Sequence, residues 1–319
     1  MRWFGFAVLV PALIASLIVI SKGNESTVVS SVSDDPTRYN YVETCKAIHD
    51  HEHLFESFRR IPGYIEIVEP TDLSIAEKTI RYMLKNHSWV IKNPGVFQKM
   101  AQIDRVGNPY LHKISVDAAE PFSISTVALR YGMYAGKVSS YLMDVAKAKN
   151  REIESVVEIG GGFGGFGIVA TDFFEFTSYT IVDIPEAVKV QKKFVSEFPL
   201  LSPVFKFVDG KSIEDPPSGE QYDLCVSTNA FSELTLEFRE LYFRHYISKC
   251  KYGFFIDNGE CFGYGKFAEA HSQLGTHRFV DKLRQTREGS GVNIKIVEED
   301  PNVNGRLECK NYEIYFWPK

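Results

Sequence analysis

The sequence predicts an α/β protein with a doubly wound, Rossmann-type sheet, and three observations support this fold. Short apolar segments alternate with helical segments from residue 153 onward, the pattern of parallel strands joined by helical crossovers. The apolar run Val156–Ile159 passes directly into a glycine-rich turn and then a helix. Two strands near the carboxyl end, separated by an Asn- and Gly-rich turn at Pro301–Gly305, predict an antiparallel hairpin. The expected strands are residues 154–159, 179–183, 204–208, 222–227, 253–257, Asn293–Val297 and Tyr312–Phe316.

The first 22 residues predict a signal anchor. Trp3–Ile20 is an uncharged apolar run of 18 residues, flanked by Arg2 and Lys22. As a helix rising about 1.5 Å per residue, this run reaches ~27 Å, enough to span the hydrocarbon core of a bilayer. The flanking charges predict a single-pass type II membrane protein whose body lies in the Golgi or another lumen of the secretory pathway. A signal peptide cut near Ser21–Gly23, giving a secreted protein, is the alternative.

Residues 23–44 are rich in Ser, Thr, Asp and Asn without periodicity and predict a stem or linker. Sequons for N-glycosylation begin at Asn24 and Asn86, consistent with a lumenal body. The net charge of −5 and the lack of a basic tract predict that nucleic acid is not a partner. Among five cysteines, Cys225 falls in a predicted central strand and is expected to be a small buried hydrophobe.

Residues 45–150 predict a helical leader or cap. Apolar residues recur at helical spacing from Ala47 to Phe58, and Asp72 or Ser74 is expected to cap a second helix. A further helix, carrying Arg130, should begin after the capping residues Ser123–Thr126. The run His49–His53 looks like a metal box, but on a helix it offers two or three ligands at most. We therefore interpret it as a solvated polar face and predict no metal site.

The glycine-rich turn predicts an adenosine-bearing cofactor. Gly160, Gly162 and Gly165 satisfy G-x-G-x-x-G, so a dinucleotide and an NAD-linked oxidoreductase stay open. Glu158 stands two residues before the first glycine, and Asp183 ends the next strand, where a carboxylate can accept hydrogen bonds from a ribose diol. The acid before the glycines, the long leader and the terminal hairpin favour S-adenosylmethionine. A glycine-rich turn without any cofactor is the remaining alternative.

Several further blocks resemble one family, the sugar O-methyltransferases, which are class I S-adenosylmethionine-dependent enzymes. They are Asp104–Pro109, Leu129–Tyr131, Glu158–Gly165, Val182–Pro185, Ser227–Leu234 and a strand led by Gly253 that ends at Asp257 and Asn258. The resemblance covers about residues 100–260 and implies methyl transfer to a glycan hydroxyl by the domain at residues 151–319. The anchor and stem depart from the usual family member, and they imply that the cofactor is imported into a lumen. A non-catalytic lumenal protein that binds the cofactor is a further alternative.

The resemblance also implies a set of cofactor-binding residues. Gly160, Gly162 and Gly164 would lie against the cofactor, and Asp183 would hold the ribose hydroxyls. Asp209, which ends the third strand, would lie near the adenine amino group, unless it serves only the turn before Gly210. Glu158 would orient the glycine turn or the methionine amino group. Asn229 opens the loop after the fourth strand, beside the transferred methyl group.

A weakly acidic sugar hydroxyl needs a base or a metal to help remove its proton. Glu233, on the loop after the fourth strand, is the first candidate, with His271 and His277 as alternatives of suitable intrinsic pKa. Glu233 could instead interact with the dipole of the helix expected at 236–246. Asp104 and Arg130 are expected either to close over the substrate or to fix the leader to the core. The expected partners are thus a glycan acceptor and, through the amino-terminal helix, a membrane.

Overall fold

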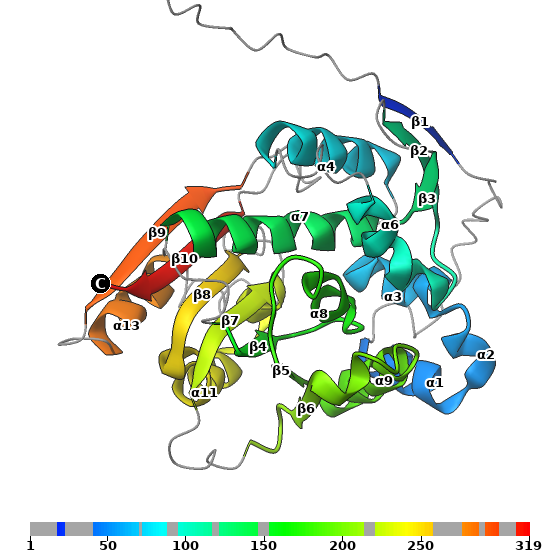
Figure 1. The fold of residues 1–319 in the computed structure, drawn as a ribbon. Coiled ribbons are helices and arrows are strands. Elements are labelled where there is room, and N and C mark those ends of the chain that lie inside the picture. Colours follow the sequence, from blue (N-terminus) through cyan, green and yellow to red (C-terminus); the bar gives the residue numbers. More distant parts are fainter. Residues whose placement is uncertain are drawn as a thin grey trace, which may run out of the picture.

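The computed structural model describes residues 18–22, 41–69, 72–87, 95–116, 121–145, 153–213, 221–257, 276–286, 291–299 and 311–319. A central sheet carries helices on both faces, and the leader packs at one side of it (Figure 1). The catalytic candidate His271 lies outside the described residues, as do Asn24, Cys261, Cys309 and most of the stem.

The central sheet has the strand order β6-β5-β4-β7-β8-β10-β9. The first five strands in this order are parallel to one another, and β10 is antiparallel to both β8 and β9. The strands are β4 (Ser155–Ile159), β5 (Ser178–Asp183), β6 (Phe205–Asp209), β7 (Tyr222–Thr228), β8 (Cys250–Asp257), β9 (Val292–Glu298) and β10 (Tyr312–Pro318). This order, with one reversed strand beside the last parallel one, is the class I methyltransferase arrangement. It confirms the predicted fold and the predicted terminal hairpin.

Each face of the sheet has its own hydrophobic core, since successive strand residues point to opposite sides. Val156 and Phe254 belong to the core under α7, α8 and α9, whereas Val157 and Phe255 belong to the core under α11 and α13. Cys225 is fully buried in the second core, as predicted. The helices and helical turns of this part are α7 (Thr126–Ser140), η4 (Tyr141–Val145), α8 (Gly165–Ala170), α9 (Pro185–Ser196), η6 (Ser202–Val204), α10 (Ala230–Glu233), α11 (Leu236–His245), η7 (Ile247–Lys249) and α13 (Thr276–Thr286).

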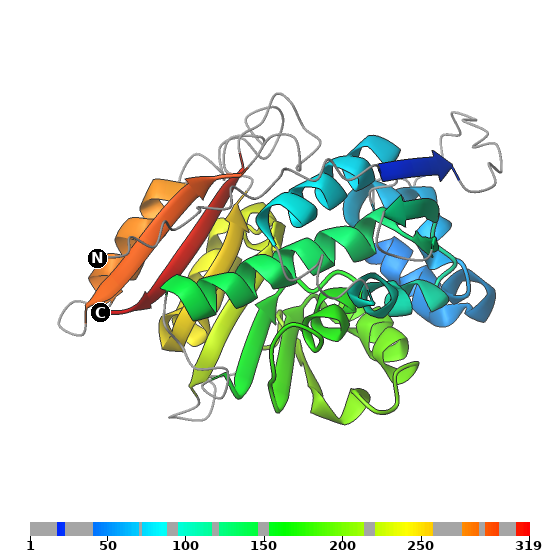
Figure 2. The same ribbon diagram turned by 45° about the horizontal axis from the view of Figure 1, so that its top comes forward.

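The leader shares a hydrophobic core with the sheet domain. Its helices are α1 (Tyr41–Asp50), α2 (Glu52–Phe55), η2 (Phe58–Arg60), α3 (Pro62–Val68), α4 (Leu73–Asn86), α6 (Val96–Met100) and η3 (Ala101–Arg105). The ring of Phe58 packs edge-on against Phe163 and Phe194, with ring centroids 5.7 and 6.3 Å apart. Figure 2 shows α7 lying across the strands, from the leader towards β10. The leader therefore forms one wall of whatever site the sheet presents.

Two of the predicted helix caps are confirmed. Asp72 caps α4, and its carboxylate accepts a hydrogen bond from the backbone N–H of Ser74 at 2.7 Å. Ser125 caps α7 and accepts from the N–H of Ala128 at 3.0 Å. Both bonds satisfy amide groups that have no partner within the helix.

A small antiparallel sheet was not predicted from the sequence. Its strands, β1 (Ile18–Lys22), β2 (His112–Val116) and β3 (Phe122–Ile124), lie beside the leader helices (Figure 1). The predicted anchor helix is therefore wrong for residues 18–20, which pair with β2 and are β-branched, a side-chain type that favours strands. Residues 1–17 lie outside the described part, and no helix within that part is long and apolar enough to cross a membrane.

Candidate functional site

A cavity of about 480 Å³ opens where β4, β5 and β7 end, within the usual size range of ligand pockets. β4 lies between β5 and β7, so this is the topological switch point at which doubly wound sheets bind ligands. The leader supplies the wall opposite the strand ends. The lining residues are Tyr41, Ile67, Val68, Val127, Arg130, Tyr131, Tyr134, Gly160, Gly161, Gly162, Val182, Asp183, Ile184, Thr228, Asn229, Ala230, Glu233, Leu234 and Tyr242.

The glycine turn brings backbone to the cavity surface. Gly160 and Gly162 have φ angles of +72° and +57°, in the left-handed region that favours glycine. A Cβ at Gly160 would overlap that of Ala230, so this position also needs glycine for space. Gly164 does not line the cavity. It caps α8 with a φ of +89°, so the shape of the turn requires glycine here, and its contact with a cofactor stays a prediction.

Asp183 faces the cavity from the end of β5. Its carboxylate accepts hydrogen bonds from the Ile184 backbone N–H at 2.8 Å and from Gln191 Nε2 at 2.7 Å. Gln191 also donates to the carbonyl of Gly162 at 3.0 Å, so a single amide group fixes both the carboxylate and the glycine turn. Burial raises the pKa of Asp183 to about 6, although these hydrogen bonds oppose the rise. Sequence reasoning missed Gln191, whose role depends on α9 packing against the turn.

Glu158 supports the turn from behind. Its side chain is 1% exposed and accepts a hydrogen bond from the Tyr179 hydroxyl at 2.9 Å. Burial raises its pKa to about 8, so the carboxyl is mostly protonated at neutral pH. Glu158 is absent from the cavity lining but lies close to Gly161, where a Cβ would stand 3.3 Å from Oε2. Of its two predicted roles, the structure therefore favours orientation of the turn over contact with a cofactor amino group.

Asn229 presents an unused acceptor at the end of β7. It adopts a φ of +76°, and its buried Oδ1 accepts no hydrogen bond from the described residues. Ser227 fixes the adjoining backbone: its hydroxyl donates to the carbonyl of Ile159 at 2.8 Å and accepts from the N–H of Phe231 at 3.0 Å. An unsatisfied buried acceptor costs about 1–3 kcal/mol, so this atom suits a ligand that donates a hydrogen bond.

Glu233 is exposed and lines the cavity, as predicted for a residue beside the reacting groups. It ends α10 and precedes α11, whose first turn holds Glu237 instead. Because Glu233 stands just before α11, the alternative interaction with the dipole of that helix also stays a prediction. His277 lies in the first turn of α13, but the placement of its side chain is outside the described part of the structure.

Asp209 serves the turn after β6. Its carboxylate accepts hydrogen bonds from the backbone N–H of Lys211 at 2.8 Å and from the Ser212 hydroxyl at 3.2 Å. It is absent from the cavity lining, whereas Tyr242 of α11 lines the cavity on this side. The geometry thus matches the simple turn role, while contact with adenine stays a prediction.

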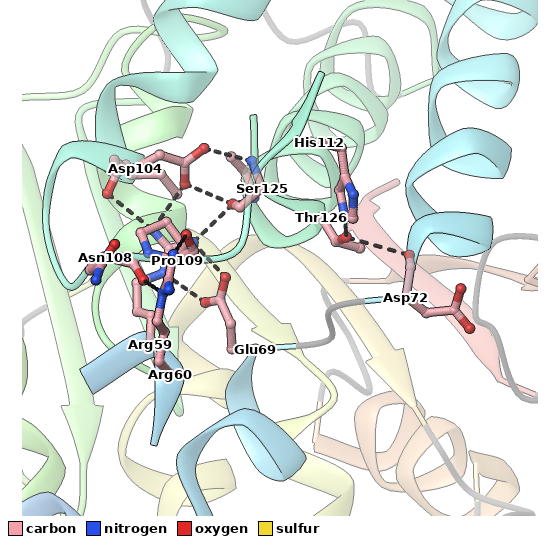
Figure 3. Close-up of polar contacts among 12 residues, drawn as sticks. Arg59, Arg60, Glu69, Asp72, Asp104, Asn108, Pro109, His112, Ser125 and Thr126 are labelled. Atoms are coloured by element: carbon pink, nitrogen blue, oxygen red, sulfur yellow. Dashed lines mark hydrogen bonds and ion pairs between the residues drawn. The ribbon is translucent and has the colours of Figure 1, made fainter. Parts of the chain in front are cut away.

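Asp104 belongs to a buried cluster of polar contacts (Figure 3) and is not among the residues that line the cavity. Arg59, with 0% exposure, donates to both oxygens of Glu69 at 2.7 Å and to Asp104 at 2.9 Å. Asp104 also accepts from the backbone N–H and the hydroxyl of Ser125, each at 2.7 Å. Because Ser125 caps α7, the cluster fixes the start of that helix to the leader. Of its two predicted roles, Asp104 has the structural one, and neither Arg59 nor Glu69 was predicted.

Arg130 lines the cavity, and its role towards the substrate stays a prediction. Val127, Arg130, Tyr131 and Tyr134 are spaced as one face of α7. Arg130 donates from Nη2 to the Tyr134 hydroxyl at 2.8 Å, and its buried Nε has no hydrogen-bond partner among the described residues. The Tyr131 ring lies over the glycine turn, with its hydroxyl 3.4 Å from the place of a Cβ on Gly162. The sequence predicted Arg130, but the aromatic residues around it carried no recognisable motif.

The donor set fits S-adenosylmethionine, as predicted. Asp183 offers acceptors for ribose hydroxyls, the glycine backbone permits close approach, and the free Oδ1 of Asn229 suits a donor group. The sheet argues against a dinucleotide, since Rossmann dehydrogenase sheets are mostly parallel in the order 3-2-1-4-5-6, without the reversed strand β10.

No protein-family model and no curated protein matches this sequence. The fold is similar to the plantazolicin methyltransferase BpumL, solved with S-adenosylhomocysteine (SAH), at 12% identity over 77% of this chain and 96% of that one, with a TM-score of 0.40. It is also similar to the methyltransferase domain of bacterial CtHen1, at 12% identity over 57% and 95% of the two chains with a TM-score of 0.41. A human methyltransferase 10 domain containing protein matches at 13% identity over 58% and 82%, with a TM-score of 0.36. At such scores we base the fold assignment on the strand order alone.

Proposed function

We propose that this protein is an S-adenosylmethionine-dependent O-methyltransferase that acts on a sugar hydroxyl. The observation that carries the proposal is the convergence of the glycine turn, Asp183 and Asn229 on one cavity at the switch point of a class I methyltransferase sheet. The sugar acceptor is supported by the sequence blocks that resemble sugar O-methyltransferases, since the cavity alone does not distinguish acceptors.

S-adenosylmethionine, when bound, supplies an electrophilic methyl group. In this proposal Asp183 accepts hydrogen bonds from the ribose hydroxyls. Gln191, which donates hydrogen bonds to that carboxylate and to the glycine turn, fixes their relative positions. Asn229 accepts one further hydrogen bond through Oδ1. Transfer to an alcohol depends mostly on positioning, which suits a cavity with rigid backbone on one side.

Glu233 removes the proton of the acceptor hydroxyl in this scheme. It is the carboxylate on the loop after β7, it lines the cavity, and its exposure keeps it in contact with solvent that can take the proton onward. The leader residues Tyr41, Tyr131 and Tyr134 line the same cavity from the opposite wall.

We further propose that the reaction takes place in the lumen of the secretory pathway, with the chain held as a type II protein. The apolar residues 3–17, which precede β1, support this, as does Asn86, which is exposed at the end of α4 where its sequon begins. Expression in a glycosylating cell should give membrane-bound protein that loses mass on glycosidase treatment. Cytosolic, unglycosylated protein would contradict the proposed location, and secreted protein would contradict only the anchor.

Comparison of methyl ethers on glycans from cells with and without this protein tests the acceptor class. We expect at least one O-methyl sugar to disappear when the protein is removed and to return with the wild-type chain but not with Glu233→Gln. Unchanged methyl ethers, together with cofactor binding by the purified chain, would favour a non-catalytic cofactor-binding protein.

A further inference from the structure

The guanidinium of Arg130 lies on the side of the cavity away from the ribose-binding carboxylate. Its hydrogen-bond partner Tyr134 packs against Phe254 of β8, with ring centroids 6.5 Å apart. Asp183 ends β5, on the opposite side of β4 and β7. Farther along α7, Lys137 contacts Glu313 of β10, so the helix runs towards that edge of the sheet. Arg130 therefore lies towards β8, on the opposite side of β7 from Asp183, and this is where we expect the methyl acceptor to bind.

Arg130, which is half-buried, differs from the buried cations Arg59 and Lys137 in having no carboxylate among the described residues in contact. Arg59 pairs with Glu69 and Asp104. Lys137 pairs with Glu313 at 2.5 Å and with Glu299 at 3.7 Å. Glu299 acts on Arg130 through longer-range electrostatics, but within the described residues Arg130 forms no ion pair and its Nε donates to nothing.

The Arg130 guanidinium is a cation with an unpaired Nε–H donor in a largely apolar cavity, and such a group favours the binding of an anion. Guanidinium binds carboxylates and phosphates through two parallel hydrogen bonds, and it does so most strongly where water is excluded. Tyr134 holds the group in place from one side and leaves Nε available. No described residue supplies the missing partner, and a bound anion would complete the contacts of this group.

We infer that Arg130 binds an anionic group, a carboxylate or a phosphate, carried by the sugar that is methylated. This inference deepens the proposed function and rests on it. The acceptor is an acidic sugar whose charged group binds Arg130 while Glu233 takes the proton from its hydroxyl. The carboxylate of the cofactor is the competing ligand. Tyr131, whose hydroxyl lies near Gly162 and makes no hydrogen bond with the described residues, stands closer to the glycine turn, where the cofactor would lie.

The first test uses anions without a sugar. The full-length chain saturated with SAH is titrated with inorganic phosphate or acetate, and the shift in melting temperature is recorded for wild type, Arg130→Gln and Arg81→Gln. Arg81 is an exposed arginine on α4 and serves as a matched control. We expect apparent anion affinity to fall about 10- to 100-fold in Arg130→Gln, the range for hydrogen bonds to charged groups, and to be unchanged in Arg81→Gln. Equal shifts in all three proteins would overturn the assignment.

The second test separates the two sources of the anion. Affinity for SAH and for 5′-methylthioadenosine, which lacks the amino acid, is measured for wild type and Arg130→Gln. The inference predicts that both affinities are retained. Loss of SAH affinity with retained methylthioadenosine affinity would overturn the inference, because Arg130 would then hold the cofactor carboxylate.

The third test identifies the acceptor class. Glycans from cells lacking the protein are separated into neutral and acidic fractions and incubated with methyl-labelled cofactor and the full-length chain. We expect label in the acidic fraction, greatly reduced for Arg130→Gln, and label in the neutral fraction would contradict the inference. If neither fraction is labelled while SAH binds, the proposed transfer to sugars fails, and the anion titration still decides whether Arg130 forms an anion site.

Discussion

The cluster around Arg59 and the cavity around Arg130 use similar groups in opposite ways. In the cluster, each buried charge meets an opposite charge from the same chain, and the group fixes α7 to the leader. In the cavity, no described residue offers Arg130 a carboxylate or donates to Asn229 Oδ1, and the Asp183 carboxylate lies at the surface of an open volume. A closed set of contacts indicates a role in stability, whereas a set left incomplete indicates a ligand. Substitutions in the two regions should therefore change different measured quantities.

The largest expected effect is on turnover. Glu233→Gln keeps the shape of the side chain but cannot accept a proton, and a positioned general base contributes about 100- to 10,000-fold. Turnover should fall within that range, while the melting temperature and cofactor affinity should stay near those of the wild type. Glu237→Gln, one turn into the next helix and outside the cavity lining, is the matched control. Near-normal turnover for Glu233→Gln would move the search for a base to His271 and His277.

The cluster should show the converse, a loss of stability without a change in chemistry. Arg59→Met leaves Glu69 and Asp104 buried without their cation, and breaking a buried pair costs about 3–5 kcal/mol. Urea unfolding should show this loss. Arg60→Met, the adjacent control, removes hydrogen bonds to backbone carbonyls and a cation–π contact with Tyr110 but no ion pair, and should cost about 1–2 kcal/mol. Equal losses for the two variants would mean that the cluster is not the fixed point proposed.

Cofactor affinity should depend on Asp183. Asp183→Ala removes charge-assisted contacts worth about 1.5–3 kcal/mol, or roughly 10- to 100-fold in affinity. Calorimetry on the folded variant measures the change directly, and an unchanged affinity would reassign the carboxylate to the support of the turn alone.

The pKa of Asp183, raised to about 6 by burial, adds a pH dependence with opposite signs for binding and stability. Affinity should fall as the pH drops through 6, because protonation removes acceptor capacity. In the ligand-free protein, the stabilising contribution of this group is present below its ordinary pKa and is lost as the pH rises through 6. Asp183→Asn should flatten both profiles, and a wild-type affinity that stays constant from pH 8 to pH 5 would contradict this account.

The smallest effect is expected at Asp209. Asp209→Ala removes the two hydrogen bonds that hold the turn after β6, which should cost about 1 kcal/mol in unfolding experiments. Cofactor affinity should remain within about twofold of the wild type. A fall of tenfold or more would restore the adenine contact that the family resemblance implies.

Much of the fold follows from local patterns. The five parallel strands and the two terminal strands were predicted within a few residues of their bounds, because apolar runs bounded by turns are legible along the chain. The small sheet was missed because its pairing joins Ile18 to Val116, across a separation that no local pattern records. Arg59 was not predicted for the same reason, because its partner Asp104 comes from a different element of the leader, far away in the sequence.

The candidate site divides in the same way. Gly160, Gly162, Asp183 and Asn229 were predicted because each sits beside a strand end, and all four line the cavity. Gly164 and Asp209 follow the same sequence pattern, but their positions at a helix cap and in a turn depend on backbone geometry. The prediction treated Asp104 and Arg130 together. Tertiary packing, which the sequence does not show, places Arg130 at the cavity and Asp104 against Arg59.

The central claim is that the cavity at the switch point binds S-adenosylmethionine, and calorimetric titration of the full-length chain tests it most directly. The account predicts saturable one-to-one binding of S-adenosylmethionine and SAH, with no detectable binding of NAD at the same concentrations. Binding of NAD without binding of S-adenosylmethionine would contradict it.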